Sequence, residues 1–219
     1  MGVDTIRDIY RRLYDRFGPQ HWWPGDGRFE IIVGAILTQN TNWTNVERAI
    51  ERLRQAGVLC PEAMAALPID TLAEHIRPAG YYNLKARRLK AFLTWLFDRF
   101  GGDLTGPDRM ATVTLREELL DVSGIGPETA DSILLYAFER AVFVVDAYTA
   151  RIAARHGLIE LGTDYESLRS VFEDALPPDV TLFNEYHALL VRVGKAYCKR
   201  RPRCTGCPLE DLPHEIDPM

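Results

Sequence analysis

Apolar side chains recur along most of the chain at the three- and four-residue spacing of an amphipathic α-helix. The pattern is clearest in residues 29–37, 46–53, 89–96 and 168–175. Short segments rich in Gly, Pro and Asp separate these stretches and have the composition of turns. The one run typical of a β-strand, AVFVVD at 141–146, has no second run to pair with. The pattern therefore predicts an all-α protein of roughly ten helices joined by short links.

One interruption of the helical pattern has unusual chemistry. In VSGIGPETADSILLYA (122–137), Gly124 and Gly126 stand between two helical segments, and a proline and a glutamate follow them. Glycine permits positive φ and close approach to the backbone, while Pro and Glu suit the first turn of a helix. Such a turn presents backbone N–H groups that bind a phosphate oxygen without a basic side chain. The candidate phosphate-binding residues are Gly124, Ile125, Gly126 and Thr129; the alternative is an ordinary corner between two helices.

The overall charge argues against a nucleic-acid partner, although the average hides local basic runs. The 219 residues carry a net charge of −5, but basic side chains gather in NLKARRLK (83–90) and KAYCKRRPRC (195–204). Such runs either contact phosphates or form solvated surface. The chain has no apolar run long enough to span a bilayer and no hydrophobic signal core near its start. We therefore expect a soluble, cytoplasmic protein with no membrane partner.

Three of the four cysteines, Cys198, Cys204 and Cys207, lie within ten residues. In a reducing compartment such a group favours a metal site over disulfides. Cys60 stands alone beside Pro61, and we expect it to be an ordinary loop or core thiol.

The hairpin and the segment after it, FVVDAYTARIAARHG, together resemble the helix-hairpin-helix signature of the endonuclease III superfamily of DNA glycosylases. The resemblance implies two helical lobes with a DNA-binding and catalytic cleft between them. One lobe is expected at 27–134, ending in the helix-hairpin-helix at about 116–138. The other is expected to combine 1–26 with 135–219 and to carry the cysteine loop at 198–207.

By the same resemblance Asp146 is the catalytic carboxylate. The alternative function of Asp146 is to cap the N-terminus of the helix that follows it. The apolar VFVV before it predicts a partly buried carboxylate. Burying such a group is costly, and perturbed carboxylates cluster at functional sites.

Residues upstream extend the resemblance and indicate the branch of the superfamily. In GAILTQNTNWTNVERAI (34–50), Gln39 matches a residue that helps to fill the gap left by an extruded base, because a base has to leave the stack before its glycosidic bond can be reached. Bifunctional members carry a lysine nucleophile on the hairpin, where this chain has Glu128, which cannot form a Schiff base. The adenine-mismatch branch needs a glutamate where this chain has Ala35.

The match is closest to the bacterial helix-hairpin-helix 3-methyladenine DNA glycosylases and covers most of residues 20–160. The matching segments are WWP (22–24), AILTQNT (35–41), RPAGYYNLKARRLK (77–90), GIGPETAD (124–131) and VVDAY (144–148). The base-pocket and intercalation residues that this resemblance implies are Trp22, Trp23, Pro24, Gln39, Trp43 and Glu128.

The implied activity is that of a monofunctional DNA glycosylase of base excision repair, acting as a nucleoid-associated monomer on double-stranded DNA with a damaged base. The implied base is 3-methyladenine or another alkylated purine. Such a base is cationic, so tryptophan adds cation–π attraction of about 0.5–2 kcal/mol to stacking worth roughly 1–3 kcal/mol. A cationic base is a good leaving group and needs no general acid. One carboxylate facing the sugar is then enough to stabilise the positive charge that develops there. The alternatives are an endonuclease III-like glycosylase acting on oxidised or deaminated pyrimidines, and a non-catalytic helix-hairpin-helix DNA-binding protein.

The cysteine spacing, C-x5-C-x2-C, resembles the iron–sulfur loop of endonuclease III, C-x6-C-x2-C-x5-C. Pro213 stands in place of the fourth cysteine, although a [4Fe–4S] cluster usually takes four thiolates. His214 is the replacement that the sequence favours, ahead of Asp217. Three outcomes stay open: a [4Fe–4S] cluster with an atypical fourth ligand, zinc bound by three Cys and one His, and a loop of free thiols.

Overall fold

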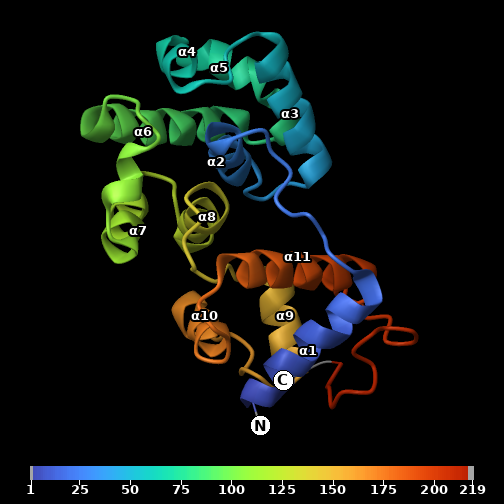
Figure 1. Ribbon diagram of the computed structural model, residues 1–219. Helices are drawn as coiled ribbons and strands as arrows, with labels where there is room; N and C mark the ends of the chain where they lie inside the picture. The colour runs from blue at the N-terminus through green and yellow to red at the C-terminus, as the bar shows by residue number, and fades with distance from the viewer. Residues whose placement is uncertain (1, 217–219) are drawn as a thin grey trace. The chain divides into compact units, whose positions relative to one another are not determined.

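The chain folds into helices joined by short loops (Figure 1). The computed structural model describes residues 2–216, and within this range it contains no β-strand. The all-α prediction is confirmed, and residues 141–146 belong to neither a helix nor a strand. Two compact units form, Met1–Trp22 with Ala141–Met219 and, separately, Trp23–Arg140. No helix in the described range is both long and apolar enough to cross a membrane.

The unit Trp23–Arg140 is built around helix α2. Its helices are α2 (Arg28–Leu37), α3 (Trp43–Gln55), α4 (Pro61–Ala66), α5 (Ile69–His75), α6 (Tyr82–Phe100), α7 (Thr112–Asp121) and α8 (Pro127–Ser132), with the short helical turns η1 (Arg77–Ala79), η2 (Gly106–Arg109) and η3 (Ile133–Ala137). Eight of the ten residues of α2 are buried, as expected for a helix that is apolar on nearly all sides. It packs against α3, α6, α8 and η3.

The two lysines of the basic run at 83–90 interact with this core, whereas Arg87 of the same run is exposed. Lys85 is 1% exposed, and its Nζ donates to the carbonyls of Leu37 (2.9 Å) and Ala79 (2.8 Å), where α2 and η1 end. Lys90 Nζ donates to three carbonyls at the end of α4. The last carbonyls of a helix lack intrahelical partners and carry partial negative charge, so these cations replace the missing partners. Burial lowers the pKa of Lys85 to about 8.

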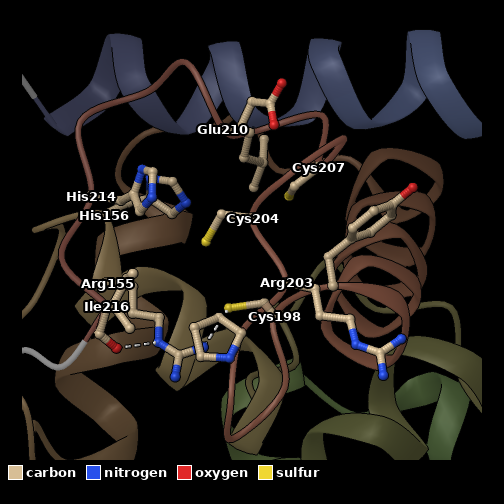
Figure 2. Close-up of a pocket in the computed structure, with 12 residues that line it drawn as sticks. Arg155, His156, Cys198, Arg203, Cys204, Cys207, Glu210, His214 and Ile216 are labelled. Atoms are coloured by element: carbon tan, nitrogen blue, oxygen red, sulfur yellow. Dashed lines mark hydrogen bonds between the residues drawn. The ribbon is translucent and has the colours of Figure 1, made fainter.

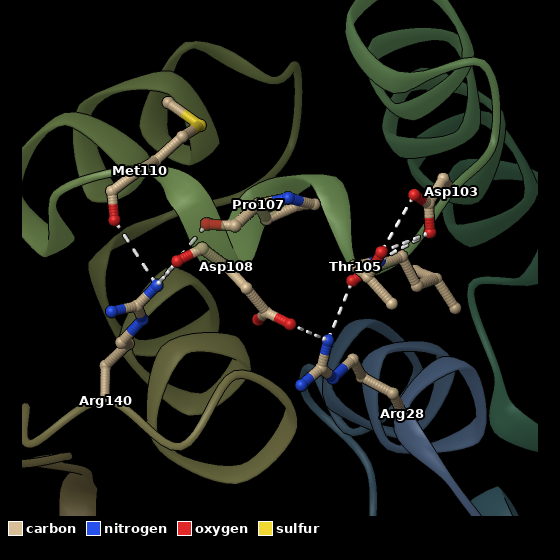
Figure 3. Close-up of polar contacts among 8 residues, drawn as sticks. Arg28, Asp103, Thr105, Pro107, Asp108, Met110 and Arg140 are labelled. Carbon is tan, nitrogen blue, oxygen red and sulfur yellow. Dashed lines mark hydrogen bonds and ion pairs between the residues drawn. The ribbon is translucent and has the colours of Figure 1, made fainter.

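Helices α7 and α8, which form the hairpin, are joined by a buried ion pair. Arg116 on α7 donates from Nε (2.7 Å) and Nη2 (3.1 Å) to the carboxylate of Asp131 on α8. Asp131 is fully buried. Two further arginines fix η2, the turn just before α7 (Figure 3). Arg28 Nη1 donates to Asp108 Oδ2 (2.9 Å), and Arg140 Nη2 donates to the Asp108 carbonyl (2.9 Å). Because charge-assisted bonds of this geometry are strong, the hairpin has a well-defined conformation.

The apolar segment after α8 differs from the plain helix that the sequence predicts. Ile133–Ala137 is π-helical, and all five of its residues are buried. Such segments are rare and occur mostly at functional sites. The segment contributes Tyr136, whose ring packs against that of Trp23.

The unit Met1–Trp22 with Ala141–Met219 contains α1 (Gly2–Phe17), α9 (Ala147–Arg155), α10 (Tyr165–Glu173) and α11 (Val180–Ala196). Helix α11 lies against α1 and α9. Its core is aromatic: Phe143 stacks on Phe172 with ring centroids 4.6 Å apart and meets Phe183 edge-on at 5.3 Å. The Tyr186 hydroxyl donates to the Ile6 carbonyl (2.7 Å), which joins α11 to α1.

Helices α9, α10 and α11 begin with the same local device. Asp146, Asp164 and Asp179 each occupy the N-cap, and each side chain accepts a hydrogen bond from the backbone N–H three residues later. Such a cap contributes about 1 kcal/mol to helix stability. The device also determines where Asp146 is placed.

Candidate functional site

Asp146 lies where a buried segment without regular secondary structure enters helix α9. Residues 142–145 are all buried, and the Asp146 side chain is only 13% exposed. Its Oδ1 accepts hydrogen bonds from the backbone N–H (2.8 Å) and the hydroxyl (2.9 Å) of Thr149. The predicted partial burial of this carboxylate is confirmed, and so is its position as an N-cap.

The second carboxylate oxygen of Asp146 has a different environment. Oδ2 lies 3.8 Å from Nε2 of His187 on α11, which is longer than a hydrogen bond. Burial lowers the pKa of His187 against the opposing effect of the Asp146 carboxylate, so the imidazole is neutral at neutral pH. Within residues 2–216 no hydrogen bond reaches Oδ2. Oδ1 therefore caps helix α9, while Oδ2 can interact with a ligand.

Gly194 on α11 lets α9 pack closely at this point. A Cβ atom at Gly194 would lie 2.5 Å from Cδ1 of Tyr148, a separation that side chains essentially never show. Tyr148 is two residues beyond Asp146, so the absence of a side chain at Gly194 helps to determine the position of the carboxylate.

The two glycines of the hairpin have different structural roles. Gly124 has φ +89°, and a Cβ atom there would lie 2.3 Å from Cγ of Arg88, so only glycine fits. Gly126 has φ −94° and open space where a Cβ would be. The N–H of Ile125 donates to the Val122 carbonyl (3.0 Å), whereas no acceptor within residues 2–216 is found for the N–H of either glycine. The hairpin therefore offers the N–H groups of the two glycines to a ligand.

Gln39 links a second predicted motif to the hairpin. Its Nε2 donates to the Gly124 carbonyl (3.0 Å) and to Thr129 Oγ1 (2.9 Å), and its Oε1 accepts from Arg88 Nη1. The Thr129 side chain is buried, so it supports the turn from inside. Glu128 is exposed on the same turn. Arg88 belongs to the basic run at 83–90. Its contact with Gly124 could not be predicted from the sequence, because the two residues are far apart in the chain.

Trp23, Trp43 and Tyr136 form an aromatic cluster within the unit Trp23–Arg140. The Trp23 ring centroid lies 5.0 Å from that of Trp43, edge-on, and 4.9 Å from that of Tyr136. Helix α2 passes beneath both tryptophans, since a methyl group at Gly34 would lie 3.4 Å from Trp23 Nε1 and 3.5 Å from Trp43 Cη2. Glu47, one turn further along α3, accepts a hydrogen bond from Trp43 Nε1 (2.8 Å). The cluster thus combines electron-rich rings with a carboxylate.

The sequence did not indicate every residue of this region. Glu47 could have been found from its i,i+4 spacing to Trp43 on a predicted helix, whereas the contact of Tyr136 with Trp23 depends on the fold. Outside this cluster, Tyr81 at the start of α6 is 70% exposed and has φ +47°, a conformation that is rare for residues other than glycine. Trp22 ends the other compact unit, and Pro24 is exposed.

Arg155, at the end of α9, organises the C-terminal cysteine loop. Its Nη1 donates to Cys198 Sγ (3.1 Å) and to the Lys199 carbonyl (2.8 Å), and its Nε donates to the Ile216 carbonyl (3.0 Å). Arg155 is nearly buried. One guanidinium therefore holds both ends of the loop.

The loop brings Cys198, Cys204 and Cys207 to one cavity, which His156 and His214 also line (Figure 2). Burial, with the nearby Cys198 and Cys204, raises the pKa of Cys207. In the part of the chain that the structure describes, no three His, Cys, Asp or Glu side chains converge closely enough to hold a single metal ion. Asp217, the weaker candidate ligand, lies outside the described residues. Cys60 is an exposed loop thiol, as expected.

Comparison with known proteins identifies the family. A family model described as "HhH-GPD superfamily base excision DNA repair protein" matches residues 33–178, which include Gln39, the hairpin and Asp146. A protein of Methanocaldococcus jannaschii, provisionally named a DNA repair glycosylase, is 45% identical over 95% of this chain and 96% of its own. Endonuclease III of Thermotoga maritima is 28% identical over 94% of this chain and 91% of its own.

Solved structures agree with this assignment. The 3-methyladenine DNA glycosylase of H. pylori, bound to 1,N6-ethenoadenine, has a TM-score of 0.76 at 29% identity and covers 89% of this chain and 97% of that one. A non-covalent endonuclease III–DNA complex has a TM-score of 0.83 at 23% identity, with 96% and 94% covered, and shows the same fold. The chain therefore belongs to the HhH-GPD superfamily of base excision DNA repair proteins, as a DNA glycosylase with the endonuclease III fold.

Proposed function

We propose that this glycosylase removes 3-methyladenine, or a related alkylated purine, from double-stranded DNA and leaves an intact abasic site. The observation that carries the proposal is the aromatic cluster of Trp23, Trp43 and Tyr136 with the Glu47 carboxylate beside it. Electron-rich rings and a nearby negative charge favour a cationic base over a neutral one. The 29% identity to the H. pylori 3-methyladenine DNA glycosylase supports the same class of substrate.

Asp146 supplies the charge that the reaction needs at the sugar. The alkylated base leaves with the electron pair of the C1′–N bond, which neutralises its positive charge. Positive charge then develops on the sugar, where Oδ2 of Asp146 stabilises it. Water adds to C1′ and releases one proton, so the products are a neutral base and an abasic sugar. Thr149 holds Oδ1 throughout, and this contact keeps Oδ2 in place.

We expect contacts with DNA from the hairpin and from exposed side chains elsewhere in the chain. The N–H groups of Gly124 and Gly126 bind a phosphate oxygen. The exposed basic residues of 195–203 neutralise further phosphates, so affinity falls as the salt concentration rises. Gln39 and Tyr81 contact the bases next to the extruded nucleotide, where stacking is lost.

Base release from a panel of duplex oligonucleotides tests the substrate class. We expect excision of 3-methyladenine and no comparable release of oxidised or deaminated pyrimidines. We also expect no adduct after borohydride treatment, because Glu128 replaces the lysine that would form a Schiff base. Preferential release of a pyrimidine would contradict the substrate assignment, and a trapped adduct would contradict the monofunctional mechanism.

Trp43→Ala should reduce the preference for cationic bases. Loss of the cation–π contribution, about 0.5–2 kcal/mol, corresponds to roughly a 2- to 30-fold decrease in the ratio of kcat/KM for cationic and neutral bases. Glu47→Gln keeps an acceptor for Trp43 Nε1 and removes the charge, so it should give a smaller decrease of the same sign.

A matched control for Trp43→Ala is available in the same unit. Trp95 also donates to a glutamate, Glu118 (3.0 Å), but it lies outside the aromatic cluster. Trp95→Ala should therefore lower the melting temperature without changing the ratio of kcat/KM for cationic and neutral bases. An unchanged ratio in Trp43→Ala would exclude Trp43 from base recognition.

We further propose that Cys198, Cys204 and Cys207 hold a [4Fe–4S] cluster. A single zinc ion needs all its ligands within about 2.0–2.3 Å of one point, whereas a cluster binds each thiolate at a separate iron and sets the sulfurs further apart. The three thiols line one cavity, and the resemblance of their spacing to the iron–sulfur loop of endonuclease III supports the cluster over zinc. When bound, the cluster would hold the three thiols of the loop together and would take no part in glycosidic bond cleavage. If elemental analysis finds zinc and no iron, the cluster proposal is wrong and the loop binds zinc instead.

A further inference from the structure

His156 contacts the backbone of Pro213, the residue that stands in place of the fourth cysteine of the endonuclease III loop. Pro213 occupies that position in this chain, and its carbonyl oxygen lies 3.1 Å from Nδ1 of His156. His156 is the C-cap of α9 and precedes Pro213 by 57 residues. The contact therefore results from the fold, and the spacing of the cysteines gives no indication of it.

This hydrogen bond determines which ring nitrogen of His156 can bind a metal. A carbonyl oxygen only accepts, so Nδ1 carries the proton and donates it, and Nε2 of the neutral ring has the lone pair. A metal-binding histidine commonly donates its other N–H to a carbonyl or a carboxylate, which orients the ring. His156 has this second contact already.

His156 also lies beside the three thiols. It lines the same cavity as Cys198, Cys204 and Cys207, and Figure 2 shows the two imidazoles on the side of Cys204. The preceding residue, Arg155, donates to Cys198 Sγ (3.1 Å). One helix end therefore carries both the imidazole and the guanidinium that holds the first thiol.

His214 is less well fixed than His156. Its Nδ1 contacts the Leu212 carbonyl (2.8 Å), only two residues away on the same irregular loop. The ring centroids of His156 and His214 are 5.6 Å apart. Because His156 extends from a helix whose neighbouring residues, Ala153 and Ala154, are buried, it loses less conformational freedom when a ligand binds.

We propose that Nε2 of His156 is the fourth protein ligand of the cluster at Cys198, Cys204 and Cys207. The inference rests on the cluster proposed above and changes its ligand set. His214, which the sequence favoured, then packs beside His156 without binding iron.

The test compares the full-length protein, purified without oxygen, with His156→Ala, His156→Cys and His214→Ala. His21→Ala is the control for loss of an exposed histidine of the same unit. Iron and acid-labile sulfide per chain are measured, together with visible absorbance. We expect His156→Ala to lose most of its iron and absorbance. His156→Cys should retain the cluster with an altered spectrum, and His214→Ala and His21→Ala should match the wild type.

Pulsed EPR of the reduced cluster gives a readout that does not depend on the stability of the alanine variant. With isotopically labelled histidine, a strongly coupled nitrogen should appear in the wild type and in His214→Ala and disappear in His156→Cys. Loss of this signal in His214→Ala only, or full iron content in His156→Ala, overturns the assignment of His156 and leaves the metal site intact. A wild-type protein with neither iron nor zinc overturns the metal site, and the assignment with it.

Discussion

Asp146→Asn is expected to lower the rate of excision of an alkylated base by about a thousandfold or more, because it removes the charge that stabilises the developing oxocarbenium ion. Asparagine caps a helix about as well as aspartate does, so the contact with Thr149 and the start of α9 should persist. Binding to DNA with an abasic site should be nearly unchanged, since the proposed phosphate contacts lie on the hairpin. Single-turnover kinetics and a binding titration measure the two effects.

Asp164→Asn is the matched control for this substitution. Asp164 caps α10 as Asp146 caps α9, accepting from the N–H (3.0 Å) and the hydroxyl (2.7 Å) of Ser167. Any loss of activity that arises from weaker capping should therefore appear in both variants. If Asp146→Asn releases the base at the wild-type rate, or if Asp164→Asn is equally impaired, Asp146 is not the catalytic carboxylate.

Local sequence was sufficient for the features that depend on neighbouring residues. Helices follow from the spacing of apolar positions, and the hairpin follows from Gly124, Gly126 and Pro127, whose backbone preferences act within a few residues. The N-cap at Asp146 depends on Thr149, only three residues away. The burial of this carboxylate could be predicted because the apolar residues that cause it directly precede it.

Contacts between distant segments could not be read in the same way. The run at 83–90 resembles a basic surface, yet Lys85 finds its acceptor at Leu37, 48 residues away. Whether a lysine is solvated or caps a buried helix end depends on what the fold places opposite it. The same reason applies to Trp23 with Tyr136 and to His156 with Pro213. The π-helical turn that carries Tyr136 has no sequence signal distinct from that of an α-helix.

The second large effect is expected from Gly126→Val. Valine readily adopts the extended φ and ψ of Gly126, −94° and 177°, and nothing surrounds the site where its Cβ would lie. The fold should therefore keep its circular dichroism spectrum and melting temperature. The branched side chain would prevent a phosphate from approaching the N–H groups of Gly124 and Gly126. Each hydrogen bond to a charged group contributes about 1.5–3 kcal/mol, so losing both should weaken DNA binding by roughly two to four orders of magnitude.

Two further variants separate loss of the phosphate site from loss of structure. Thr114→Val places the same side chain at an exposed position of α7 in the same hairpin and should bind DNA as the wild type does. Gly124→Ala should instead lower the melting temperature, because its φ of +89° and its contact with Arg88 exclude a Cβ atom. Wild-type DNA affinity in a folded Gly126→Val protein would show that the phosphate is bound elsewhere. The exposed basic residues at 195–203 would then have to supply the salt-dependent affinity alone.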